Sequence, residues 1–330
     1  MSFARTLFRT SALLLTLNVG ALTYAQTSDT LTLPRYQTVK LDNGMTLLLM
    51  EHHEVPIVSL SFIVKTGSVA DPVGKEGVAM LVGDLLRKGT LTRSSEQIST
   101  ELDFIGARFN VNAGLDYSSG DAEFLSKDLS KGVELLADIV RNPTFRPEEV
   151  ARLMAQHRDR LRSAKDSANR VIGSYFDAYL FGDHPYGRPV AGDENSIGTI
   201  SRDDITTFHE SYYTPENTIL AAVGDFSIAE MQALIEASFE TWPQRPAPAM
   251  LIDEPPPVTE TRVLLVDKPD STQTYFYIGN VGVNRTHPDR VPIGVVNTFF
   301  GGRFTSRLNT ALRVESGLTY GAGSRFRFLQ

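Results

Sequence analysis

Proline is concentrated in one stretch of this chain, where six of the fifteen residues from 243 to 257 are proline. Each proline fixes φ and lacks a backbone N–H, so such a run cannot continue a helix or lie inside a sheet. It favours extended, semi-rigid backbone instead. The stretch therefore predicts a linker over 243–257. It separates a domain over 26–242 from a smaller unit over 258–330, which is either an appendage or an incomplete domain.

The hydrophobic pattern on both sides of this linker mixes strands and helices without strict alternation. β-branched or alternating runs predict strands at 36–41, 45–50, 57–66, 107–112, 117–125, 217–223, 262–267 and 273–279. Helical periodicity predicts helices at 76–88, 94–105, 128–140, 148–181, 201–211, 227–239 and 289–300. This irregular order favours an α+β fold over a doubly wound parallel sheet.

Charge and cysteine content exclude several classes of function. The chain has 32 lysines and arginines against 39 acidic residues, a net charge of −7. It therefore lacks the basic field expected of a nucleic-acid-binding protein. It also contains no cysteine, which excludes disulfides, thiol catalysis and cysteine-bound zinc. Any metal would have to be held by His, Asp or Glu.

The first 25 residues have the pattern of a signal peptide. Arg5 and Arg9 precede an apolar run over 11–21, and Ala25 provides a small residue at the cleavage point. The run is short for a membrane span, although an uncleaved anchor is the alternative. We expect residues 1–25 to be removed during export to the periplasm, leaving a chain of net charge −9 with no stable membrane insertion.

The segment 74–90 carries the most informative motif. Its frame resembles the pitrilysin/insulinase family of zinc metallopeptidases, which includes the mitochondrial processing peptidase. The family pattern is G-x-A-H-x-x-E-H-x-L-x-K-G-T, in which two histidines bind zinc and the Glu is a general base. The frame is kept by Gly77, Ala79, Leu86, Lys88, Gly89 and Thr90. The positions of the two histidines and the Glu are instead Met80, Asp84 and Gly83.

The resemblance also implies a third zinc ligand, a Glu on a later helix, and its position in this chain is Arg160. A guanidinium remains protonated and cannot bind a metal. We therefore expect no zinc and no catalytic residue in this chain. Our hypothesis is that an Asp84–Arg160 ion pair fills the volume of the zinc ion. The alternative is that Met80 packs in the core and both charges point to solvent.

Three further segments, 181–192, 213–225 and 300–320, are similar to recurrent segments of the same family. The last one is similar to the family's L-R-E-x-x-G-L-x-Y, whose Arg and Tyr contact the substrate backbone near the scissile bond. Both are present, as Arg313 and Tyr320. The resemblance thus extends over nearly the whole chain after the signal peptide. It implies that Arg313 and Tyr320 bind substrate.

The resemblance implies a two-layer α+β domain, an antiparallel-rich mixed sheet packed with helices, followed by an incomplete second domain of the same kind over 258–330. Some members work as heterodimers in which one subunit binds zinc and the other is metal-free. The resemblance therefore predicts a non-catalytic subunit that positions a peptide substrate for a zinc-bearing partner of the family. The alternative is a non-enzymatic periplasmic protein that binds peptides or assists assembly.

Overall fold

A computed structural model describes residues 34–269 and 271–330 of the chain. The predicted signal peptide, 1–25, lies outside the described residues. Six strands form one sheet: β1 (Gln37–Lys40), β2 (Thr46–Glu51), β3 (Ile57–Val64), β4 (Arg108–Ala113), β5 (Ser118–Leu125) and β6 (Thr218–Gly224). Their order is β1-β2-β6-β3-β5-β4. β2 and β6 pair in parallel, and the other pairs of this sheet are antiparallel.

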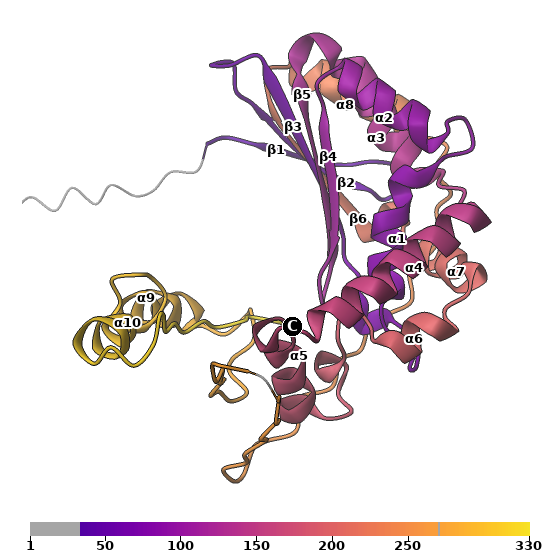
Figure 1. The fold of residues 1–330 in the computed structure, drawn as a ribbon. Helices are drawn as coiled ribbons and strands as arrows, with labels where there is room; N and C mark the ends of the chain where they lie inside the picture. The colour runs from indigo at the N-terminus through magenta and orange to yellow at the C-terminus, as the bar shows by residue number, and fades with distance from the viewer. Residues whose placement is uncertain (1–33, 270) are drawn as a thin grey trace, which may run out of the picture. The chain divides into compact units, whose positions relative to one another are not determined.

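Four helices lie along one face of this sheet (Figure 1). They are α1 (Val78–Leu85), α2 (Ser95–Phe104), α3 (Leu129–Arg141) and α8 (Ile228–Phe239). Alternate residues of the strands, such as Leu60 and Phe62 in β3, are buried in one core with the apolar sides of these helices. The predicted two-layer α+β architecture with an antiparallel-rich mixed sheet is confirmed.

Two glycines let the layers approach closely. Phe62 pairs across the sheet with Gly120, and a Cβ at position 120 would lie 2.2 Å from the Phe62 ring. Gly132 on α3 leaves similar room, because a Cβ there would lie 2.3 Å from the Phe124 ring. Since buried side chains are close-packed, neither position can accept a larger residue without displacing an aromatic ring.

The predicted helix over 148–181 is wrong as a single element. The structure has α4 (Pro147–Ala164) and α5 (Ala168–Phe181), separated at Ser167, whose backbone is extended with φ −119° and ψ 114°. Asp166 and Ser167 favour such a break because their side chains compete for backbone hydrogen bonds. α6 (Glu194–Thr199) was not predicted, whereas α7 (Arg202–Tyr212) was. Single 3₁₀ turns lie at Ser68–Ala70, Leu86–Lys88, Ser126–Asp128, Pro185–Gly187 and Pro215–Asn217.

Beyond the proline-rich stretch the structure has α9 (Arg290–Phe300), α10 (Arg307–Asn309) and a π-helical turn, Thr310–Glu315. The helix predicted at 289–300 is confirmed, but the strands predicted at 262–267 and 273–279 are wrong. A strand needs a neighbour for its N–H and C=O groups, and neither segment pairs with one in the described part of the chain. None of the described helices is long and apolar enough to cross a membrane.

A buried carboxylate fixes the start of α1. Asp71 accepts hydrogen bonds from the backbone N–H of Gly77 at 2.7 Å and of Ala79 at 2.9 Å. These N–H groups belong to the first turn of α1, which lacks intrahelical partners for them. Burial raises the pKa of Asp71 to about 7, although both hydrogen bonds favour its ionised form. The position of α1 therefore depends on a carboxylate that is only 3% exposed.

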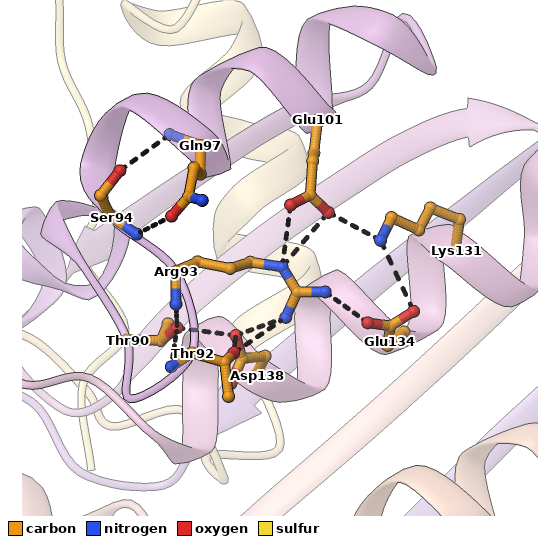
Figure 2. A network of polar contacts seen from close by, with 9 residues as sticks. All are labelled: Thr90, Thr92, Arg93, Ser94, Gln97, Glu101, Lys131, Glu134 and Asp138. Carbon is orange, nitrogen blue, oxygen red and sulfur yellow. Dashed lines mark hydrogen bonds and ion pairs between the residues drawn. The ribbon is translucent and has the colours of Figure 1, made fainter.

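A second polar network joins the loop after α1 to α2 and α3 (Figure 2). Arg93 binds Asp138 at 2.7 Å and Glu101 at 3.1 Å, and also pairs with Glu134. The Arg93 side chain is 14% exposed and that of Asp138 9%. Burial opposes ionisation of Asp138, but hydrogen bonds from Asn142, the Thr90 hydroxyl and Arg93 lower its pKa overall.

We predict that Arg93→Met destabilises the protein by about 2–4 kcal/mol, because it leaves a buried carboxylate unpaired. Urea unfolding followed by circular dichroism measures the change. The matched control is Arg152→Met, which removes an exposed ion pair with Glu149 on α4 and should cost about 0–1 kcal/mol. Equal effects of the two substitutions would contradict the role of the Arg93 network.

We also predict that Asp71→Asn shifts the slope of the unfolding free energy against pH to a more positive value between about pH 4 and pH 7. With its folded pKa near 7 and an unfolded value of about 3.9, Asp71 binds more protons in the folded state across this range. Its contribution therefore makes the free energy of unfolding fall as pH rises, by up to about 1.4 kcal/mol per pH unit.

Urea titrations at several pH values test this prediction. The wild-type slope should be more negative than that of Asp71→Asn. Other groups contribute equally to both proteins, among them the buried His209, whose pKa is lowered to about 4 and whose contribution has the opposite sign. Asp203→Asn, an exposed substitution on α7, should keep the wild-type slope. Identical slopes for wild type and Asp71→Asn would mean that Asp71 titrates normally in the folded protein.

Candidate functional site

The helix that carries the motif exposes only part of its surface. Most residues of α1 are buried, but Met80 and Asp84 are half-buried and lie on one face, since residues four apart stack on a helix. Met80 packs against the main core. Gly83 is buried between them and faces β4, where a Cβ at position 83 would lie 3.1 Å from Val111 Cγ1. Val111 thus crowds the place where the family has its catalytic Glu.

α4 brings Arg160 to the same face. Arg160 Nη2 lies 3.7 Å from Asp84 Oδ2, and the two side chains are 59% and 32% exposed. The structure therefore brings together the two charges of the predicted ion pair, at a distance longer than a hydrogen bond. An ion pair this exposed contributes about 0–1 kcal/mol to stability. The alternative was that Met80 packs in the core while Asp84 and Arg160 both point to solvent. Of its two parts, only the packing of Met80 is observed.

These residues do not fit a zinc ion. Zinc requires neutral imidazole, thiolate or carboxylate ligands at close range. Met80 offers a thioether and Arg160 a permanent cation, so Asp84 is the sole carboxylate among the residues at the family's ligand positions. Across residues 34–269 and 271–330, no three His, Asp or Glu side chains are grouped so that they could hold a metal.

β4, against which α1 packs, is an edge strand of the sheet. Just after β4, the backbone N–H of Gly114 donates a hydrogen bond to the carbonyl oxygen of Tyr117, on the side of β5, at 2.9 Å. Because backbone direction alternates along a strand, Phe109, Val111 and Ala113 direct their N–H and C=O groups away from β5. Met80 and Asp84 therefore lie on a helix packed beside a sheet edge where most outward backbone groups have no partner among the described residues, and Arg160 reaches them from α4.

Arg313 and Tyr320 also lie together. Arg313 is in the π-helical turn, and its guanidinium carbon lies 4.9 Å from the centre of the Tyr320 ring and 4.5 Å from that of Phe304. Such cation–π contacts hold the side chain in place. Tyr320 is 87% exposed. The predicted substrate-binding pair is thus assembled within one local cluster, in which Phe304 was not predicted.

Two features of this region were missed by sequence reasoning. Asp71 has no local motif, because it reaches N–H groups six and eight residues further on. The free edge at β4 depends on the strand order, which places β4 last although it is fourth in the chain. No short-range sequence pattern predicts the hydrogen bonds of Asp71 or the edge position of β4.

Comparison with protein families gives two matches. Residues 47–194 match the model described as "Insulinase (Peptidase family M16)". Residues 199–328 match the model described as "Peptidase M16 inactive domain". The first match contains α1 and Arg160, and the second contains Arg313 and Tyr320.

Similar proteins and structures agree with these matches. An uncharacterized zinc protease of Rickettsia bellii is 29% identical over 88% of this chain and 69% of its own length. One of Mycobacterium leprae is 29% identical over 85% of this chain. The chain spans only 63% of the length of this second relative.

A crystal structure of a peptidase M16 inactive domain from Pseudomonas fluorescens superimposes with a TM-score of 0.78, at 26% identity, over 89% of this chain and 71% of the other. A protease from Helicobacter pylori shares the fold, with a TM-score of 0.79 at 21% identity over 91% of this chain and 73% of the other. The chain belongs to the pitrilysin/insulinase family, peptidase family M16.

Proposed function

We propose that this protein is a zinc-free, non-catalytic subunit of a heterodimeric metalloendopeptidase of its family. In this role it binds a peptide substrate and orients it for a partner subunit that carries zinc. Its own chain needs no cofactor. The N-terminal sequence over 1–25 supports export and a periplasmic location for the pair.

One observation carries this proposal. The residues at the zinc positions, Met80, Asp84 and Arg160, cannot bind the metal, yet Arg313 and Tyr320 are both present and lie 4.9 Å apart, measured from the guanidinium carbon to the ring centre. A guanidinium can donate two parallel hydrogen bonds to a carbonyl or carboxylate. A tyrosine hydroxyl can stabilise an oxyanion as it forms. Both groups serve a reaction whose metal is supplied by another chain.

The edge of β4 supports peptide binding. An extended peptide can add to a sheet edge and form main-chain hydrogen bonds with it. The Phe109 N–H and the backbone groups of Val111 and Ala113 are available for this, and their strand packs against α1. Peptide recognition of this kind needs no metal and depends little on side-chain sequence. It is compatible with a subunit that positions substrate without cleaving it.

The metal content of the full chain is a direct consequence. We predict that the purified protein retains far less than one equivalent of zinc after dialysis. The variant Met80→His/Asp84→His/Arg160→Glu, which supplies two imidazoles and a carboxylate on the same face, should retain about one equivalent. Elemental analysis by mass spectrometry measures both. One tightly held zinc in the wild-type chain would refute the metal-free assignment.

Peptide cleavage tests the role of Arg313 and Tyr320. Co-expressed with a zinc-bearing family member, the wild-type chain should enable cleavage that neither chain performs alone. Tyr320→Phe in this chain should lower kcat roughly 10²-fold, because one oxyanion donor is lost. Arg313→Ala should lower kcat/KM by a similar factor, because a bidentate contact with the peptide backbone is lost.

Tyr175→Phe, a partly exposed substitution on α5, is the matched control and should leave cleavage unchanged. Equal cleavage by the zinc-bearing chain with and without this subunit would rule out the heterodimer. Peptide binding without any cleavage, whatever the partner, would instead favour a non-enzymatic binding or assembly protein.

A further inference from the structure

The free edge of β4 is closed at one end by an arginine. Arg87 lies in the 3₁₀ turn Leu86–Lys88, immediately after α1. Its Nη1 donates a hydrogen bond to the carbonyl oxygen of Phe109 at 2.8 Å. That carbonyl belongs to the set directed away from β5, so Arg87 occupies an acceptor that an added strand would otherwise use. The backbone groups of Val111 and Ala113 have no such side-chain partner in the described structure.

A small pocket begins where this edge is closed. It has a volume of about 220 Å³ and lies between the end of α2 and the start of β4. Its charged lining residues are Arg87, Arg108 and Asp103, which gives it a net charge of +1. In the described part of the chain neither guanidinium forms an ion pair with an acidic side chain. The pocket therefore presents two guanidinium groups without a direct carboxylate contact, although Asp103 lines it and Glu123 lies opposite Arg108 across the β4–β5 pair.

The direction of an added peptide determines which group would enter the pocket. Antiparallel pairing is the more stable arrangement and the more frequent one. A peptide antiparallel to β4 runs from Ala113 toward Phe109, so its C-terminal end arrives at the pocket. There the edge offers the Phe109 N–H, while its carbonyl is occupied by Arg87. The residue opposite Phe109 can therefore accept a hydrogen bond from the Phe109 N–H, but its own N–H lacks that carbonyl as an acceptor. Regular pairing ends at this residue, beside the pocket.

We propose that this pocket binds the free α-carboxylate of a peptide lying antiparallel along β4, and that Arg87 and Arg108 donate the hydrogen bonds to it. This proposal rests on the proposed function as a peptide-binding subunit and names its substrate class: extended peptides with an accessible C-terminus. Arg87 also fixes the register, because pairing stops at the residue opposite Phe109. Two guanidinium groups match the two oxygens of a carboxylate. Asp103 disfavours a second anionic group in the same pocket.

Two probes of identical sequence test the proposal. They are eight-residue peptides of alternating valine and threonine with an N-terminal fluorophore, one with a free C-terminal carboxylate and one with a C-terminal amide. Fluorescence anisotropy with the full chain gives the Kd of each. The carboxylate form should bind roughly tenfold more tightly, the effect of about one charge-assisted hydrogen bond.

Variants of the pocket should abolish this preference. Arg87→Gln and Arg108→Gln should each bring the ratio of the two Kd values close to one. Arg87→Gln should bind the amide peptide at least as well as the wild type, because it frees the Phe109 carbonyl. A purely structural role of Arg87 would instead weaken both peptides equally. Arg108 is exposed, so Arg108→Gln keeps the test valid if Arg87→Gln fails to fold. Arg170→Gln, exposed on α5, should keep the wild-type ratio.

The outcomes separate this proposal from the proposed function. Tight binding of both peptides with a ratio of one would overturn the carboxylate pocket and leave peptide binding intact. Failure of both peptides to bind would overturn peptide binding along β4 and the pocket with it.

Discussion

The arrangement of the candidate site depends on how α1 is seated against the sheet. Asp71 holds the first turn of the helix through the N–H groups of Gly77 and Ala79. Gly83 then allows the helix to approach β4, within contact distance of Val111. These two contacts place the Met80 and Asp84 face of α1 beside the edge of β4. Both parts of the candidate site therefore depend on the same seating of α1.

The residues at the family's zinc positions sit within an architecture that matches the family's solved structures. In a zinc site the ligands donate lone pairs to a metal cation. Here the cation that faces the Asp84 carboxylate is the Arg160 guanidinium, carried by the second helix of the same face. The exposed Asp84–Arg160 contact adds little stability, so the stability of the domain must come from the apolar core and from buried networks such as that of Arg93. The core therefore does not depend on the contact between Asp84 and Arg160.

The sequence predicted the first domain well because its strands and helices carry strong local periodicity. The start of α2 shows this, since Ser94 and Gln97 form a capping box there, a signal contained within four residues. Prediction failed at 262–267 and 273–279, where apolar composition favours a strand but pairing depends on a neighbour distant in the chain. The pairing of Asp84 with Arg160 could be proposed only through the family frame. The Asp71 cap and the closed edge at Arg87 arise from tertiary contacts that no local pattern encodes.

In the heterodimer that we propose, the zinc ion resides in the partner subunit and not between Met80, Asp84 and Arg160. Anomalous X-ray scattering at the zinc edge, from crystals of this chain in complex with its zinc-bearing partner, tests it most directly. We predict one anomalous peak per heterodimer, at the H-x-x-E-H motif of the partner. A peak on the α1 face of this chain, within coordination distance of Asp84, would contradict the account.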